Sequence, residues 1–355
     1  MTIVHVIWQL TMGGVETMLI DIASAQTAEA DVHIVAVNSP SNPEMLAAIP
    51  EGVSFHCCNR KAGSRSPLPL LKLNMLLLKL RPDVVHTHFG KLYKYIFHRP
   101  RLFVRTVHNT TNDISEIARY DRCFAISRAV VDEWKAAGHD IPMILNGIKC
   151  GAINHEPAGY NDGKLHMVQV SRLFVKQKGQ DLILEALAML FERQPTLRER
   201  IMMHFIGDGP DEEMLRQLTR SLGLEKNVTF EGLRDRKWVY AHLHEFDLYI
   251  QPSRFEGFGL TVAEACAARI PVLVSDSEGP LEILDGGRLG MTFTTGSAES
   301  LATQLERFIT HGYPARLIDE AYAHTLERFD VSRTAAEYTA AYRAMLQTPS
   351  SPRKS

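Results

Sequence analysis

Short apolar runs alternate with segments of helical periodicity along most of this chain. Residues 2–8 (TIVHVIW), 31–37 (DVHIVAV), 165–171 (LHMVQVS) and 247–253 (DLYIQPS) have the apolar character of buried strands. The segments between them repeat apolar residues every three or four positions, which is typical of helices. Strands that alternate with helices predict parallel sheets that are covered on both faces. The fold class is therefore α/β.

The length of the chain predicts two domains. It has 355 residues, and a domain has roughly 100–200. Residues 151–163 are rich in Gly, Asn and Pro and predict a linker. The expected division is a Rossmann-like domain over 1–150, a second one over 164–330, a helix over 331–347 and a disordered tail over 348–355. Two such doubly wound domains would face a central cleft with the carboxyl ends of their strands, where ligands bind.

Composition narrows the class of protein. The hydrophobic fraction of 45% and the charged fraction of 23% fit an ordinary globular protein, and the net charge of −2 argues against nucleic acid as a partner. The five cysteines show no C-x-x-C spacing, which favours reduced thiols in the cytoplasm. The first residues lack a basic region and a cleavage site, so no signal peptide is expected. No apolar run approaches the roughly 18 residues that a membrane span needs.

Charge is distributed unevenly. The stretch 60–105 holds eleven Lys or Arg and one acid, Asp83. Within it, the strongly apolar helix expected at 68–80 precedes a basic and aromatic segment with Lys91, Lys94, Arg99 and Arg101. One interpretation is a solvated basic face next to a core helix. The other is a surface for an anionic acceptor or for an anionic membrane leaflet.

Several glycines and cations follow predicted strands. Gly14 opens the first helix, where a backbone without Cβ could approach a ligand, although a tight turn alone would also explain it. Gly207 and Gly209 lie in a turn after the strand at 201–206. Arg172 ends a strand and Lys178 precedes a helix, a pair that suits a diphosphate or merely a soluble surface. The dinucleotide fingerprint G-x-G-x-x-G is absent from the first turn, which disfavours a dehydrogenase.

The stretch 254–264 (RFEGFGLTVAE) places two acids around a glycine-rich loop. Glu256 lies before a predicted helix, with a carboxylate expected to be free. The amides of Gly257, Phe258 and Gly259 would point outward at the positive end of that helix. A carboxylate that accepts sugar hydroxyls beside amides that bind phosphate suits a nucleotide sugar. Glu264 also fits a capping box with Thr261, which would make it structural.

Two histidines on one strand raise the question of a metal. His86 and His88 would share a strand face, a spacing that can hold an ion. The sequence shows no third ligand, so we predict no metal. The two rings are expected to line the cleft or to be packed.

These motifs, in this order, resemble the retaining glycosyltransferases of family 4, which have the GT-B fold and an E-x7-E motif. The resemblance runs through GG at 13–14, KLRPDVVHTH at 79–88, TVHN at 106–109, FAISRAV at 124–130, LNGI at 145–148, SRL with KG, IGDGP at 206–210, FEGL at 230–233 and RFEGFGLTVAEACA.

The resemblance implies a role for each matching residue. Glu264 would bind the ribose, and Glu256 with the amides through Leu260 would hold the sugar and diphosphate. Arg172 and Lys178 would neutralise the diphosphate together with the backbone of Gly14. Gly207, Gly209 and Leu233 would surround the base, His108 would approach the sugar, and the last helix would cross back to the N-terminal domain. Lys149 stands where the family often has an acid, and Asn109 stands where Asp is common.

The implied reaction needs no cofactor beyond the nucleotide sugar. The chain has no D-x-D metal motif, so cations and helix N-termini would stabilise the leaving diphosphate. No nucleophilic carboxylate is identified, and the resemblance implies front-face attack. The expected enzyme moves a sugar from a UDP- or GDP-sugar to a glycan or lipid-linked acceptor in cell-surface polysaccharide or glycolipid synthesis. It would act in the cytoplasm or at the inner face of the membrane. The alternatives are an epimerase of the same fold and a non-catalytic nucleotide-sugar-binding partner.

Overall fold

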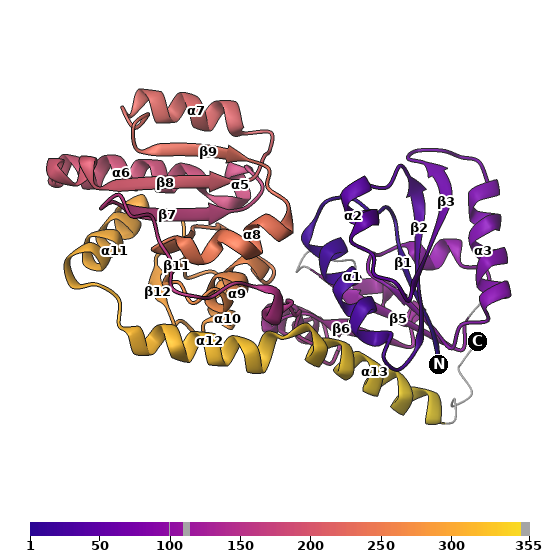
Figure 1. Ribbon diagram of the computed structural model, residues 1–355. Helices are drawn as coiled ribbons and strands as arrows, with labels where there is room; N and C mark the ends of the chain where they lie inside the picture. Colours follow the sequence, from indigo (N-terminus) through magenta and orange to yellow (C-terminus); the bar gives the residue numbers. More distant parts are fainter. Residues whose placement is uncertain (99, 109–113, 349–355) are drawn as a thin grey trace. The chain divides into compact units, whose positions relative to one another are not determined.

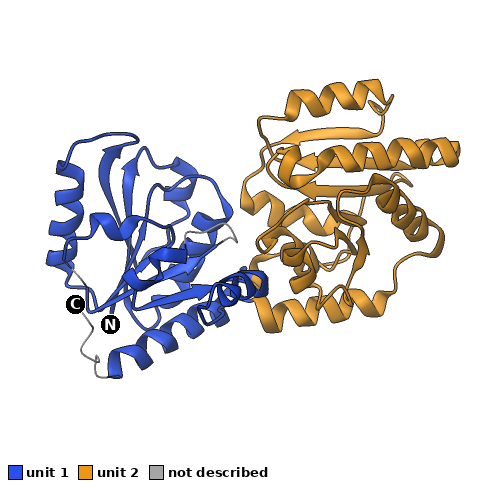
Figure 2. Ribbon diagram, turned by 180° about the vertical axis from the view of Figure 1, so that it is seen from behind, with its two compact units in different colours: residues 1–149, 330–355 blue, residues 150–329 orange. Residues whose placement is uncertain are grey.

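The computed structural model describes residues 1–98, 100–108 and 114–348. Arg99, Asn109 and all of the predicted tail except Thr348 lie outside the described residues. The chain forms two compact units, Met1–Lys149 with Asp330–Ser355 and Cys150–Phe329, which Figure 2 shows in two colours. Each unit is described by itself.

The division of the chain differs from the predicted one at the linker. Residues 151–163 are part of unit 2. The Asn154 amide donates to the Tyr240 carbonyl oxygen over 2.9 Å, and the His155 ring lies 5.2 Å from the Tyr322 ring. Helix α13 (Val331–Gln347) belongs to unit 1, where it packs against α1 (Gly14–Gln26).

The described residues of unit 1 contain a six-stranded parallel sheet in the order β3-β2-β1-β4-β5-β6. Its strands are β1 (Thr2–Ile7), β2 (Asp31–Ser39), β3 (Val53–Lys61), β4 (Val84–Thr87), β5 (Leu102–Val107) and β6 (Arg122–Ala125). Its other helices are α2 (Pro43–Ala47), α3 (Leu68–Leu80) and α4 (Arg128–Ala136), with 3-10 turns at Leu92–Tyr95 and Ile114–Arg119. The apolar run of β1 lies between β2 and β4 and is buried from Ile3 to Ile7.

Residues 150–329, all of which are described, hold a second six-stranded parallel sheet, in the order β12-β11-β10-β7-β8-β9. Its strands are β7 (Leu165–Val170), β8 (Ile201–Ile206), β9 (Val228–Gly232), β10 (Leu248–Gln251), β11 (Val272–Ser275) and β12 (Met291–Phe293). Its helices are α5 (Val175–Lys178), α6 (Gln180–Arg193), α7 (Glu212–Ser221), α8 (Arg236–His242), α9 (Leu260–Ala267), α10 (Glu278–Ile283), α11 (Ala298–His311) and α12 (Ala315–Phe329), with 3-10 turns at Cys150–Ala152, Pro195–Glu199 and Leu243–Glu245. Helices α6 and α11 pack together over one large apolar core (Figure 1).

Both sheets have the same doubly wound topology. In each unit the first strand is central, the second and third continue to one side, and the fourth lies on its other side. The winding direction therefore reverses between β1 and β4 in unit 1, and between β7 and β10 in unit 2. Ligands of such sheets bind outside the carboxyl ends of the strands at this reversal. The predicted α/β class with two Rossmann-like sheets is confirmed. Within the described ranges, no helix is both long and apolar enough to cross a bilayer.

Candidate functional site

The loops that follow β7 and β10 meet at the reversal point of unit 2. Helix α5 follows β7 and ends at Gly179, whose φ is 70°. A Cβ at Gly179 would lie 2.2 Å from the Pro252 carbonyl oxygen, which belongs to the loop after β10. Only glycine allows this approach. The contact brings the end of α5 against the stretch that carries Glu256.

Lys178 and Glu256 form an ion pair at this meeting point. The Lys178 ammonium contacts the Oε2 atom of Glu256, and the two side chains are 19% and 13% exposed. The Ser253 hydroxyl donates to the same oxygen over 3.2 Å, and the Gln251 amide lies 3.4 Å from it. The expectation that the Glu256 carboxylate is free is wrong. A loop carboxylate with little exposure is stable as an anion only when donors surround it.

A second ion pair fixes the loop to both neighbouring helices. The Arg254 guanidinium donates to the two Asp181 carboxylate oxygens over 2.8 and 2.7 Å, and to the Val175 carbonyl oxygen over 2.8 Å. The Arg254 backbone amide also donates to Gln177. Such a two-pronged contact sets orientation as well as energy. This pair could not be predicted from the sequence, because an acid at position 181 is explained by the first turn of a helix alone.

Arg172 remains available for a ligand. Its side chain is exposed after β7, and its guanidinium has no partner in residues 1–98, 100–108 or 114–348. Its carbonyl oxygen accepts from the Gln180 amide over 2.9 Å, which fixes the backbone beneath the side chain. Of the two predicted cations, Lys178 is therefore engaged by Glu256, and Arg172 is not engaged within the described residues.

Gly207 and Gly209 support the loop after β7 by close backbone contact. A Cβ at Gly207, where φ is 134°, would lie 2.1 Å from the Ser171 carbonyl oxygen. A Cβ at Gly209 would lie 2.2 Å from that of Leu173. The Gly207 amide donates to Gly232, next to Leu233, whose side chain is 52% exposed. Both glycines are thus needed for packing, and Leu233 is the exposed apolar surface beside them.

Helix α9 begins two residues earlier than a capping box of Thr261 and Glu264 requires. Gly259 occupies the N-cap with φ of 98°, and Leu260 is the first helical residue. Thr261 lies inside the helix, and its hydroxyl contacts the Tyr249 hydroxyl at 2.7 Å. The amides of Gly257, Phe258 and Gly259 have no acceptor in the described part of the chain. The Phe258 ring is buried against the Phe329 ring, with centroids 5.6 Å apart.

Glu264 lies in a polar pocket instead of a cap. Its residue is 8% exposed. The Tyr240 hydroxyl donates to its Oε1 atom over 3.2 Å, and the Arg236 Nε atom lies 4.0 Å away. Arg236 also donates to the Tyr240 hydroxyl. The capping interpretation of Glu264 is therefore wrong, because its carboxylate contacts side chains of α8 and lies beyond the first turn of α9.

The predicted residues of unit 1 follow strands β1 and β5. Gly14 is exposed at the start of α1, after β1. His108 is half-buried directly after β5. Its Nε2 atom lies 3.2 Å from Nδ1 of His88. Burial, together with the nearby Arg105 guanidinium, lowers the pKa of His108 from 6.5 to about 3, so its ring is neutral at neutral pH.

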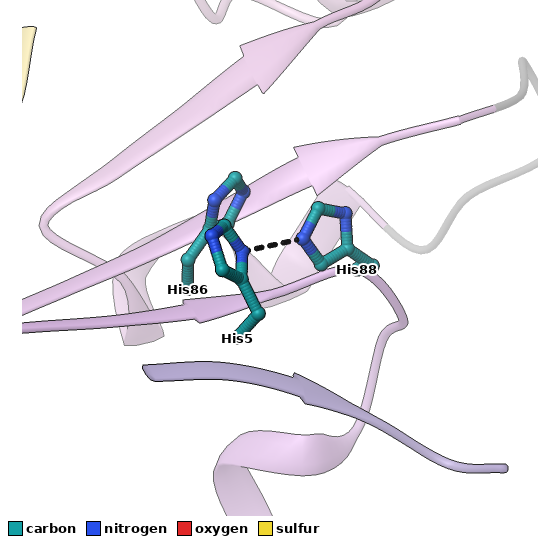
Figure 3. Close-up of side chains that lie close together, drawn as sticks. All are labelled: His5, His86 and His88. Carbon is teal, nitrogen blue, oxygen red and sulfur yellow. Dashed lines mark hydrogen bonds between the residues drawn. The ribbon is translucent and has the colours of Figure 1, made fainter. Parts of the chain in front are cut away.

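His86 and His88 are joined by a third buried histidine that sequence reasoning missed. Figure 3 shows His5, His86 and His88 side by side, with His5 bonded to His88. One ring nitrogen of each lies within 4.8 Å of the others, as in a metal site. However, the two ring nitrogens of His86 already contact the Thr106 and Tyr342 hydroxyls at 2.8 and 2.7 Å. The three rings form a hydrogen-bonded network in which each ring nitrogen has a protein partner.

Lys149 has a structural partner. Its ammonium pairs over 3.1 Å with Asp21, whose side chain is 1% exposed. A buried carboxylate requires such a counter-charge. The cation at this position therefore stabilises the end of unit 1.

Two family models match this chain. Residues 12–151 match the model described as Glycosyltransferase Family 4, and residues 152–324 match the one described as Glycosyl transferases group 1. A phosphatidyl-myo-inositol mannosyltransferase of Mycobacterium leprae is 25% identical over 93% of this chain and 92% of its own length. A lipopolysaccharide 1,6-galactosyltransferase of Salmonella typhimurium is 27% identical over 59% of this chain and 57% of its own length.

Solved structures share the fold. The Anabaena protein Alr3699/HepE in complex with UDP and glucose has a TM-score of 0.80 at 21% identity, covering 97% of this chain and 100% of that one. The apo form of the lipopolysaccharide outer core galactosyltransferase WaaB has a TM-score of 0.72 at 20% identity, with coverage of 97% and 100%. The expected GT-B fold is confirmed.

Proposed function

The chain belongs to the family 4 glycosyltransferases of the GT-B fold, and from this premise we propose that it is a retaining, metal-independent enzyme that transfers a sugar from a nucleoside-diphosphate donor to a lipid-linked saccharide. Relatives support the acceptor class, since their names specify lipopolysaccharide and phosphatidylinositol substrates. A structural relative holds UDP and glucose, which supports a nucleotide-sugar donor.

The Lys178–Glu256 ion pair is the observation that best supports this function. A cation and an acid that contact each other at the reversal point can exchange partners when a nucleotide sugar binds. Lys178 would turn from the carboxylate to the diphosphate, and Glu256 would then accept hydrogen bonds from sugar hydroxyls. Arg172 would contact the diphosphate as well, because its guanidinium is not engaged. The amides at residues 257–259 would add donors at the start of α9.

The chemical step then places negative charge on the leaving diphosphate. The bond between the anomeric carbon and the phosphate oxygen breaks, and the acceptor oxygen forms the new bond on the same face. The phosphate oxygen takes the acceptor proton. Arg172 and Lys178 stabilise the developing charge, the task that a metal ion performs in other enzymes. Glu264, held by Tyr240, would bind the ribose hydroxyls, and Gly14 would offer its amide to the phosphates.

Release of nucleoside diphosphate tests this function. We expect release from a UDP- or GDP-sugar that depends on an added lipid-linked saccharide, with the sugar recovered on that acceptor. EDTA is expected to leave the rate unchanged, because protein cations stabilise the leaving group. Release of free sugar without acceptor would identify an epimerase or hydrolase, and binding without turnover would identify a non-catalytic partner. Loss of activity in EDTA with rescue by Mn²⁺ would contradict metal independence.

The roles of Arg172 and Lys178 can be tested by substitution, with a neighbouring lysine as the control. Arg172→Ala and Lys178→Ala are each expected to lower kcat by about 10²–10³-fold, the usual cost of losing one transition-state donor. Lys176→Ala is the matched control, since Lys176 is exposed on the same short helix as Lys178. Steady-state rates and thermal unfolding are measured for all three variants. A folded Arg172→Ala enzyme with the rate of the Lys176 variant would refute the role of Arg172.

Substitutions of Glu256 and Glu264 are expected to change the affinity for the nucleoside diphosphate differently. Glu256→Gln should lower turnover without weakening the binding of the nucleoside diphosphate, because that product carries no sugar. Glu264→Gln should weaken diphosphate binding, because the ribose is present in both donor and product. Isothermal titration with UDP and GDP measures both values, and Glu185→Gln on α6 serves as the control. Unchanged affinity in the Glu264 variant would leave its carboxylate with a structural role only.

The outer face of helix α3 is a candidate surface for the encounter with a lipid-linked acceptor. Its inner face is buried through Leu73 and Leu77. Its outer face exposes Leu68, Leu71, Met75 and Leu78, which are 70%, 47%, 69% and 51% exposed. At 3.6 residues per turn these four side chains span roughly 80° of the helix surface. The interpretation of this helix as plain core is therefore wrong for its outer face.

Charged and aromatic residues border this apolar stripe. Exposed Lys72 and Lys79 lie along one side of it on α3. The buried Asn74 side chain bonds to the backbone of Tyr95 and Phe97, which brings the 64% exposed Phe97 beside the helix. Apolar side chains that enter a bilayer and lysines that meet anionic headgroups are the features of peripheral membrane helices. We propose that α3 contacts an anionic membrane surface.

Flotation with lipid vesicles tests this contact. Binding to vesicles with phosphatidylglycerol is expected to exceed binding to phosphatidylcholine vesicles and to weaken with salt, because each basic residue contributes about 1 kcal/mol at an anionic surface. A Leu71→Ser and Met75→Ser double variant should lose most binding while keeping its thermal stability. Leu326→Ser, at a 37% exposed position of α12, is the control. Equal binding to both vesicle types would refute the proposal.

A further inference from the structure

A chain of hydrogen bonds runs through the core of unit 1 to His108. The His5 Nε2 atom lies 2.8 Å from the Gln26 Oε1 atom. The His5 Nδ1 atom lies 3.1 Å from Nε2 of His88, and Nδ1 of His88 lies 3.2 Å from Nε2 of His108. His5 is on β1, His88 follows β4, and His108 follows β5. Gln26, His5 and His88 are at most 2% exposed, so water does not interrupt the chain.

Each ring in this chain carries one proton at neutral pH. Burial lowers the pKa of His5 to about 4 and that of His108 to about 3. Burial, with the neighbouring imidazoles, also lowers the pKa of His88 well below 6.5. A neutral imidazole is a donor at one nitrogen and an acceptor at the other. The direction of one hydrogen bond therefore determines the direction of every other bond in the chain.

The amide oxygen of Gln26 determines that direction. An oxygen can only accept, so His5 donates from Nε2 and is left with a lone pair on Nδ1. His88 must then donate from Nε2 to His5, which leaves its own Nδ1 as an acceptor. His108 must in turn donate from Nε2 to His88. The remaining nitrogen of His108, Nδ1, thus holds a lone pair.

We propose that Gln26, His5 and His88 are positioning residues that fix His108 in the tautomer with the proton on Nε2, so that its Nδ1 atom accepts a hydrogen bond from a hydroxyl of the sugar substrate. This role in substrate binding rests on the proposed function, whereas the tautomer does not. A group that can only accept favours a sugar with a hydroxyl at this position over one with fluorine or hydrogen there. The fixed tautomer also avoids the energetic cost of selecting one of two ring states when substrate binds.

Histidine tautomers can be measured without any activity. In long-range ¹H–¹⁵N spectra of ¹⁵N-histidine-labelled protein, a bare ring nitrogen resonates far downfield of a protonated one. His108→Gln identifies the signals of His108. We expect a bare Nδ1 and a protonated Nε2 between pH 6 and 8. A protonated Nδ1 in the wild-type protein would overturn the proposal, whatever substrate the enzyme uses.

Variants of the terminal residue test the coupling. Gln26→Met removes the acceptor and is expected to give a mixture of His108 tautomers. The expected loss in kcat is about tenfold, equivalent to about one hydrogen bond. Gln26→Glu keeps an acceptor and should restore the single tautomer and most of the rate. His56→Phe is the control, because His56 bonds to His33 at another pair of strands. Wild-type spectra and rates in Gln26→Met would refute the positioning role.

The same measurements separate this inference from the proposed function. A bare Nδ1 in a protein that transfers no sugar would leave the tautomer established and refute acceptance from a sugar hydroxyl. A misfolded Gln26→Met variant does not remove the test, since the wild-type spectrum alone decides which nitrogen is protonated.

Discussion

A parallel sheet that is covered on both faces has its chemistry confined to the ends of its strands. The faces of β1 and β10 are filled by helices, and their backbone groups are used by neighbouring strands, so polar side chains can emerge only where a strand stops. Both units place their first strand beside their fourth. Lys178 and Glu256 follow these two strands in unit 2, and Gly14 and His88 follow them in unit 1. The order of the strands thus determines where the candidate site lies, and the side chains there determine its chemistry.

Electrostatics explain why the site is stable when no ligand is bound. A carboxylate that is 13% exposed would be costly alone, and contact with Lys178 lowers that cost. The Arg254–Asp181 pair plays a different part, because it makes three contacts that tie the loop to α5 and α6. The Lys178–Glu256 pair is a side-chain contact that an anion can replace. In the other pair, Arg254 also donates to the backbone of α5. Preorganisation by the second pair keeps the partners of the first within reach.

The elements and motifs that depend on a local sequence pattern could be predicted from the sequence. Strands with continuous apolar runs, such as β1, β7 and β8, were found, as was the motif that carries Glu256 and Glu264. β3 was missed because its half-exposed edge position lets polar residues such as His56 and Asn59 interrupt the pattern, and β12 has only three residues. The capping box failed because Gly259, in a left-handed conformation, moved the start of α9. The partners Asp181, Tyr240 and His5 lie between 21 and 83 positions from the residues they contact, which are Arg254, Glu264, Gln26 and His88. No periodicity encodes such contacts.

The polar clusters described above differ in charge between the two units. Unit 2 places charged groups at its reversal point, namely Arg172, Lys178, Glu256 and Glu264. The cluster around His86 in unit 1 consists of imidazoles, phenols and hydroxyls, and burial lowers the pKa of His5, His86 and His88 and keeps these three rings uncharged. A neutral ring satisfies a donor and an acceptor at once, so a run of such rings can cross an apolar core without a counter-ion. Nucleotide sugars divide their polarity in the same way, with charge on the diphosphate and neutral hydroxyls on the sugar. The charged groups of unit 2 thus suit a diphosphate, and the neutral acceptors of unit 1 suit hydroxyl groups.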